Sequence, residues 1–391
     1  MTSPGDKAAE PRGDADASVD ASPSGVYTTA ARALSVGAAL SRPSTLNGLE
    51  PDLASIGIQR LPQRWGSWED RLRILDDSEE VLQRYGIRDH VLYAEELPPG
   101  SAGEHPRALS ARVDLWRDLA EARSQPVSVA WLRLLATGQE PVSAVAACAA
   151  LSHWRPKADT RIPLALKRGR DSLRWYAESS SPEARAIAAA AIGSDPPGPG
   201  NQPEAVTAYQ EDPISIIVDG TFGWEGKWWY PGGDFHTYVT QEVRPNLFQG
   251  RNAFSWSGFY RKRDRETAAE RLAGWVEDTN AGSLDALFAH SYGGVIALRA
   301  TSYGLRIANL VLLSVPAEHV RTEWRNIERA ASLRIHLDLV LLAARRPQLF
   351  TENVEEHYLP RWFWSHGDSH NPSVWKDHGC SAALGLTSAP G

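Results

Sequence analysis

The sequence predicts a mixed α/β chain whose C-terminal part folds around a parallel-type sheet. From residue 212 onward, short apolar runs alternate with helical patterns, which is typical of a parallel sheet covered by helices. Residues 106–193 are instead rich in Ala, Leu and Arg with prolines between the runs, so we place a helical accessory region at 46–193. Residues 1–45 are rich in Ala, Ser, Pro, Gly and Asp, and we expect this segment to be disordered.

Composition argues against several classes of protein. The 391 residues carry a net charge of −7 without a basic stripe, so nothing favours nucleic-acid binding. The two cysteines, Cys148 and Cys380, are too few for a disulfide framework. The chain has no uncharged apolar run of roughly 18 residues, which a transmembrane helix needs, and its polar, acidic beginning lacks the pattern of a secretory signal. We therefore expect a cytoplasmic protein with no transmembrane segment.

Two patterns organise the helical region. Residues 71–86 have the periodicity of one amphipathic helix that ends at Gly86. A weak internal repeat follows, in which the similar segments at Pro141 and Pro182 lie 41 residues apart and each place proline where the first turn of a helix tolerates it. The spacing is similar to that of HEAT repeats, roughly 40–47 residues, which present a groove to a protein partner. A small helical bundle is the alternative.

The strands of the C-terminal domain are predicted from short apolar runs. A linker rich in proline and glycine, residues 194–211, separates this domain, residues 212–387, from the helical region. Strands are predicted over residues 214–218, 253–256, 284–289, 307–316, 333–337 and 362–364, with a helix over 266–282.

The turn after the run 284–289 carries the main chemical signal. Ser291 stands between an apolar strand pattern and a helix start, with Ala289 two residues before it and Gly293 two residues after it. A nucleophile elbow needs small residues at those two positions, because the strand and helix backbones nearly touch there. Gly294 follows and strengthens the pattern. An ordinary strand-to-helix turn is the alternative.

Residues 212–387 resemble the α/β-hydrolase superfamily of esterases and lipases. The stretch Asp219-Gly220-Thr221-Phe222 is similar to the superfamily's oxyanion loop, although Asp219 stands where histidine is usual. The resemblance implies that the N–H groups of Tyr292 and of Thr221 or Phe222 bind the oxyanion.

The same resemblance implies an acid and a histidine after the serine, in that order. Asp338 follows the run 333–337, at the position that this fold reserves for the acid. His366 aligns with the catalytic histidine of related hydrolase tails and would serve as the base, with Asp338 holding its tautomer. His370 is the alternative base. His336 and His378 are expected to be structural and exposed, respectively.

A metal site is another interpretation of these histidines. His366 and His370 lie four residues apart, and Asp368 or Asp377 could complete a zinc site. Gly367 and the proline at position 372 disfavour the helix that this spacing needs, and no zinc motif is present. We therefore expect neither a metal nor another cofactor.

Together these residues predict a serine hydrolase that cleaves an ester through an acyl-enzyme on Ser291. The expected substrate is a small-molecule or lipid ester, and the aromatic loop over residues 224–238 is the expected lid or pocket wall. The alternative is a catalytically degenerate scaffold that binds a protein partner through its helical region. Asp219 and Ala289, the two departures from the superfamily pattern, favour that alternative.

Overall fold

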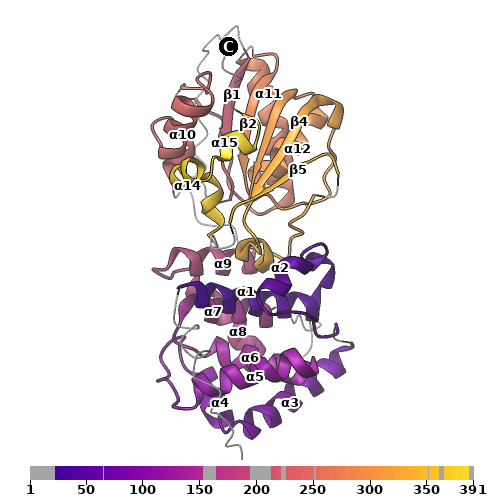
Figure 1. Ribbon diagram of the computed structural model, residues 1–391, viewed down its shortest axis with the longest axis vertical. Helices are drawn as coiled ribbons and strands as arrows, with labels where there is room; N and C mark the ends of the chain where they lie inside the picture. The colour runs from indigo at the N-terminus through magenta and orange to yellow at the C-terminus, as the bar shows by residue number, and fades with distance from the viewer. Residues whose placement is uncertain are drawn as a thin grey trace, which may run out of the picture.

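The protein consists of a helical part and a sheet-based part, which follow one another along the long axis of the computed structural model (Figure 1). The structure describes residues 23–64, 66–152, 164–193, 213–221, 226–250, 252–279, 281–350, 352–360 and 365–386. The predicted linker over 194–211 and the predicted strand over 362–364 therefore lie outside the described residues.

The sheet is parallel throughout, and among the described residues it has five strands that lie side by side in chain order. These strands are β1 (Ile214–Val218), β2 (Leu284–His290), β3 (Ile307–Leu313), β4 (Ile327–Arg334) and β5 (Glu355–Tyr358). Every residue of β1 is buried, as expected for a parallel strand that is covered on both faces. Because the strands are parallel, their carboxyl ends share one edge, and this edge faces the helical part (Figure 1).

Helices cover both faces of the sheet. In β2, Leu287 and Ala289 belong to the apolar core on one face, whereas Ala286 and Phe288 belong to the core on the other face. This alternation follows from the two-residue period of a strand. The first face packs against α11 (Lys262–Asp278) and α12 (Tyr292–Ala300), and the second against α10 (Asp234–Tyr238), α14 (Pro372–Asp377) and α15 (Cys380–Ala383).

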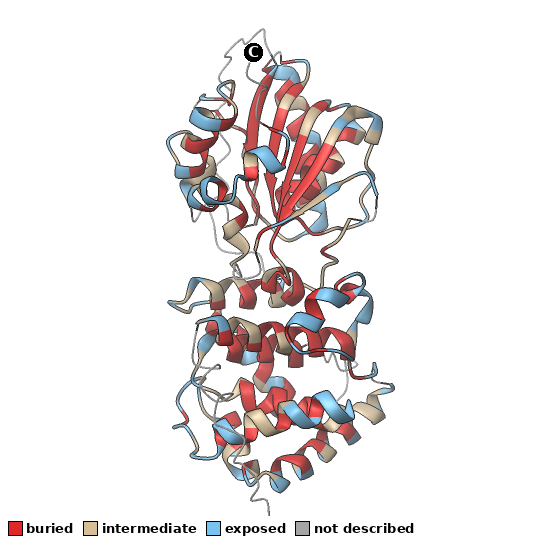
Figure 2. Ribbon diagram, in the orientation of Figure 1, coloured by how far each residue is buried: buried red, intermediate tan, exposed pale blue. Residues whose placement is uncertain are grey.

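The helical part is a layered stack that contains its own core (Figure 2). Its helices are α1 (Pro23–Ser41), α2 (Glu50–Ser55), α3 (Trp68–Arg84), α4 (Arg88–Glu96), α5 (Ala108–Ala122), α6 (Gln125–Ala136), α7 (Pro141–Ser152), α8 (Leu164–Tyr176) and α9 (Pro182–Ile192). The two repeated prolines begin α7 and α9, where a helix tolerates them. Within the described residues, no helix combines the length and the apolar character that crossing a membrane requires.

Helix α1 corrects the prediction of disorder for residues 23–45, whereas residues 1–22 lie outside the described residues. Every residue from Thr29 to Leu40 is buried except Arg32. Gly37 lies so close to Ala150 of α7 that a Cβ at position 37 would overlap the Ala150 side chain. A composition rich in Ala and Gly indicates disorder in an isolated segment, but here the small residues let two helix backbones approach closely.

Other elements of the sheet-based part also differ from the prediction. Residues 253–256 do not form a strand, although Phe254 and Trp256 are buried there. Of the predicted run 333–337, only Leu333 and Arg334 belong to a strand, at the end of β4, which begins at Ile327. The run 307–316 is a strand only to Leu313, and the predicted helix over 266–282 begins four residues earlier as α11. β5 has no counterpart in the prediction, because its polar sequence Glu-Glu-His-Tyr is that of an exposed edge strand.

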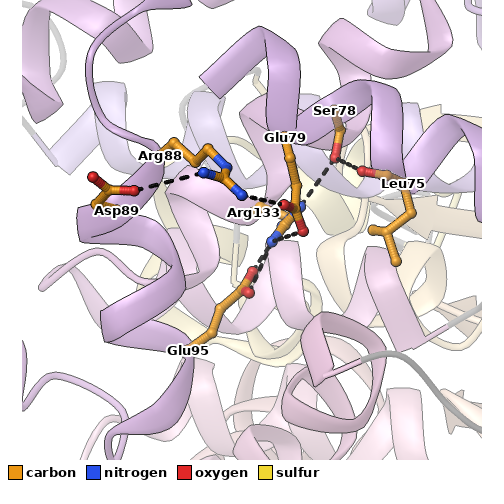
Figure 3. Close-up of polar contacts among 7 residues, drawn as sticks. All are labelled: Leu75, Ser78, Glu79, Arg88, Asp89, Glu95 and Arg133. Atoms are coloured by element: carbon orange, nitrogen blue, oxygen red, sulfur yellow. Dashed lines mark hydrogen bonds and ion pairs between the residues drawn. The ribbon is translucent and has the colours of Figure 1, made fainter. Parts of the chain in front are cut away.

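A buried ion pair joins two helices of the helical part (Figure 3). Arg133 of α6 is 1% exposed and donates two hydrogen bonds to Glu95 of α4, at 2.8 and 2.9 Å. Its remaining terminal nitrogen donates to Ser78 Oγ of α3 at 3.1 Å. Glu79 of α3 adds a longer ion pair to Arg133, at 3.7 Å. The bidentate pair with Glu95 and these contacts to α3 fix the relative positions of α3, α4 and α6.

One short helix of the sheet-based part packs into the core of the helical part. Helix α13 (Leu339–Ala343) follows β4 and places Leu339, Leu342 and Ala343 in the apolar core of the helical part. Next to it, His336 Nδ1 lies 2.7 Å from Asp52 Oδ1 of α2. The helical part is therefore fixed to the carboxyl edge of the sheet.

Candidate functional site

Ser291 occupies a sharp, strained turn at the carboxyl end of β2. Its backbone has φ 50° and ψ −129°, which a residue other than glycine rarely adopts. The loop after β1 lies directly against this turn: a Cβ at Gly220 would stand 2.7 Å from Ser291 Cβ, and one at Gly293 would stand 2.8 Å from Val218 O. The glycines at positions 220 and 293 are therefore required by the close approach of the two backbones.

Asp338 and His366 come together beside this turn. His366 Nδ1 lies 2.6 Å from Asp338 Oδ2, and the Asp338 carboxylate is buried at 1% exposure. The second carboxylate oxygen caps α13 by accepting hydrogen bonds from the N–H groups of Val340 and Leu341, at 3.0 and 3.1 Å. The main chain of Asp338 is held in turn by Gln348, whose Oε1 accepts from the Asp338 N–H at 3.0 Å. These bonds fix the carboxylate, which in turn orients the imidazole of His366.

The outer nitrogen of this histidine is not engaged. His366 Nε2 is buried, and no hydrogen-bond partner reaches it from any described residue. The hydrogen bond between Ser291 and His366 is therefore not formed in this structure. Both residues nevertheless line the same cavity of about 390 Å³, so each side chain has access to a molecule bound there.

His370, the alternative base, has a different environment. Its ring stacks on Trp228, with 3.8 Å between the ring centroids and 9° between the planes. Burial, together with the proximity of His366, lowers the pKa of His370 to about 3. The carboxylate of Asp338 bonds to His366 instead. The geometry of a carboxylate-oriented histidine thus belongs to His366.

His290, which the sequence reasoning did not single out, completes a cluster of three imidazoles. Its ring centroid lies 4.7 Å from that of His366 and 4.6 Å from that of His370. Burial and these two neighbours lower the pKa of His290 well below its ordinary value. Among the described residues, no group of three or more His, Cys, Asp or Glu side chains is arranged to hold a metal ion.

The loop after β1 contains an unusual carboxyl group. Burial raises the pKa of Asp219 to about 8, and its Oδ1 has no hydrogen-bond partner among the described residues. The main-chain oxygen of Asp219 accepts from Trp256 Nε1 at 3.0 Å, which anchors the loop. Thr221 lines the cavity beside Ser291. Phe222, the other expected oxyanion residue of this loop, lies outside the described residues, whereas Tyr292 follows Ser291 as the first residue of α12.

The expected lid over 224–238 is only partly an exposed loop. Trp224 lies outside the described residues, but Phe235 and Tyr238 of α10 are buried in the core between the sheet and α14. This part of the segment belongs to the core rather than to a lid. The wall opposite the sheet comes instead from the helical part, through Tyr27 of α1 and Glu183 and Ile187 of α9. Sequence reasoning missed these residues, because only the packing of α13 brings α9 to the site.

Comparison of the chain with models of protein families, with curated proteins and with solved structures finds no match. The chemistry of the site is therefore argued from its residues alone.

Proposed function

We propose that this chain is a serine hydrolase that cleaves a carboxylic ester, with Ser291 as nucleophile, His366 as base and Asp338 as orienting acid. The observation that carries the proposal is the 2.6 Å bond between a fully buried carboxylate and His366 at a cavity that also exposes Ser291 in a strained strand-to-helix turn. A buried carboxylate holds an imidazole in the tautomer whose outer nitrogen accepts a proton, which is what a serine nucleophile needs.

The proposed reaction proceeds through an acyl-enzyme. In the substrate complex, Ser291 Oγ donates a hydrogen bond to His366 Nε2, which has no partner among the described residues, since such bonds often tighten only when substrate is bound. His366 takes the hydroxyl proton as Oγ attacks the ester carbonyl, and then gives it to the leaving alcohol. The N–H of Tyr292 and the N–H of Thr221 or Phe222 stabilise the oxyanion. Water, deprotonated by the same histidine, then releases the acid.

The same features support assigning residues 212–387 to the α/β-hydrolase superfamily. The all-parallel sheet, the elbow after β2 and the order serine, acid, histidine along the chain agree with that pattern. The helix starts at Pro141 and Pro182 support a HEAT-like arrangement of the helical part in the same way.

One observation favours the alternative, a degenerate scaffold that only binds a partner. Asp219 places a carboxyl group in the loop that would hold the oxyanion, and an ionised carboxylate there would oppose the developing negative charge. Because the pKa of Asp219 is raised to about 8, the group is protonated and uncharged below that pH and does not oppose the developing negative charge.

A fluorophosphonate probe separates the two functions. We expect it to label the wild type covalently and to leave Ser291→Ala unlabelled. Ser314→Ala is the matched control, because Ser314 is buried, also has positive φ and follows the neighbouring strand β3. Labelling that persists in Ser291→Ala, or a folded wild type that stays unlabelled, would exclude Ser291 as the nucleophile.

A further inference from the structure

The cavity that Ser291 and His366 share is closed by the helical part. Tyr27, near the start of α1, and Glu183 and Ile187 of α9 form its far wall. None of these residues belongs to the sheet-based part that supplies the proposed triad. The site is therefore incomplete without the helical part, which lies across the carboxyl edge of the sheet (Figure 1).

This wall is fixed in place. Asp338, which orients His366, is also the residue that begins α13. Leu339 and Leu342 of α13 lie in the core of the helical part, and Leu339 also lines the cavity. The contact between His336 and Asp52, at 2.7 Å, adds a second link close by. Moving the helical part would expose this shared core and displace the carboxylate, so the arrangement differs from a hinged lid.

The chemical character of the wall is apolar with one acidic group. Ala186 and Ile187 of α9 supply apolar surface, and Glu183 supplies a carboxylate. Among the described residues that line the cavity, none is lysine or arginine. Burial raises the pKa of Tyr27, and the negative charge of Glu183 raises it further.

We propose that α9 and the beginning of α1 form the specificity wall of the active site, and that they select a small ester with an apolar group and no negative charge. A volume of about 390 Å³ lies at the lower end of the range for small-molecule sites, roughly 300–1,000 Å³. A carboxylate in the substrate would meet Glu183 without a compensating cation among the described lining residues, whereas an ammonium group would be attracted. This inference rests on the proposed hydrolase function.

Substrate length tests the apolar wall. The full-length chain would be assayed with p-nitrophenyl acetate and p-nitrophenyl hexanoate. In Ala186→Leu, extra methyl groups fill the space beside Ile187, and we expect the ratio of kcat/KM for hexanoate to that for acetate to fall about tenfold. Ala191→Leu is the matched control, because Ala191 is on the same helix and packs against the helical core without lining the cavity. The control should leave the ratio unchanged.

Substrate charge tests Glu183. Three esters of similar length would be compared, namely p-nitrophenyl butyrate, 4-aminobutyrate and hemisuccinate. The wild type should prefer the aminobutyrate to the hemisuccinate by about tenfold or more. Glu183→Gln, which keeps the size of the side chain, should reduce this preference several-fold, and Glu183→Lys should reverse it.

Fluorophosphonate labelling of Ser291, measured in parallel, separates the two possible failures. If no variant or wild type is labelled, the proposed function itself is wrong. If labelling is normal but neither ratio responds to Ala186→Leu or to Glu183→Lys, or if Ala191→Leu changes the length ratio as much, the wall does not determine specificity. A variant that fails to fold loses both labelling and its circular dichroism signal. In that case the isosteric Glu183→Gln tests the wall, through its effect on the preference for the aminobutyrate over the hemisuccinate.

Discussion

The buried carboxyl group of Asp219 makes the stability of the protein depend on pH in a direction that is unusual for an aspartate. Its pKa is about 8 in the folded protein and about 3.9 in an unfolded chain. Between these values the folded protein keeps a proton that the unfolded chain releases, so this group lowers the free energy of unfolding as the pH rises. The loss is about 1.4 kcal/mol per pH unit, absent below about pH 4 and complete above about pH 8.

Asp219→Asn removes this ionisation while keeping the size of the side chain. Any effect of the amide on packing is independent of pH. The informative quantity is therefore how the difference in the free energy of unfolding between variant and wild type changes with pH. From pH 5 to pH 7 the variant should gain about 3 kcal/mol of stability relative to the wild type. Urea unfolding followed by tryptophan fluorescence at several pH values measures this difference. A difference that stays constant over this range would refute the assignment of a neutral, buried carboxyl group to Asp219.

Three further predictions concern the site and the helical core. Asp338→Asn should keep the cap on α13, since asparagine caps helices as well as aspartate does. It should nevertheless lower kcat for p-nitrophenyl acetate by about four orders of magnitude, because His366 loses its orienting carboxylate. A loss below tenfold would contradict this role. Gly293→Ala should lower the urea midpoint strongly or abolish soluble expression, because the new Cβ overlaps the main-chain oxygen of Asp219. A midpoint equal to that of the wild type would show that the turn at Ser291 tolerates a Cβ at position 293. Glu95→Gln should cost about 3 kcal/mol in urea unfolding, because Arg133 then keeps only the longer contact of 3.7 Å to the half-buried Glu79. Adding Arg133→Met should recover most of this loss, and a cost under about 1 kcal/mol would mean that the pair contributes little.

Local patterns predicted the centre of the sheet well. The runs that become β1, β2 and β3 are mostly apolar and mostly buried, which is typical of parallel strands covered on both faces. The turn at Ser291 was readable for the same reason, since close backbone approach restricts the residues on either side of it. The pairing of Asp338 with His366 was an expectation from the resemblance, and the structure brings these two side chains into contact.

Features that depend on packing between distant segments could not be predicted from the sequence. Helix α1 has a composition that indicates disorder, and only the fit of Gly37 against α7 explains why it is buried. β5 is polar because it is an edge strand, so its sequence carries no apolar signal. The wall formed by α9 requires α13 to insert into the helical core, and no spacing or motif in the sequence specifies that insertion.

The central claim is that Ser291 becomes acylated, and mass spectrometry of the trapped intermediate tests it most directly. The protein would be mixed with p-nitrophenyl acetate, quenched in acid within seconds and digested. We predict one acetyl group on the peptide that contains Ser291, and no such adduct in Ser291→Ala under the same conditions. Turnover of the ester without an adduct on Ser291, or an acetyl group of equal yield in Ser291→Ala, would contradict the account.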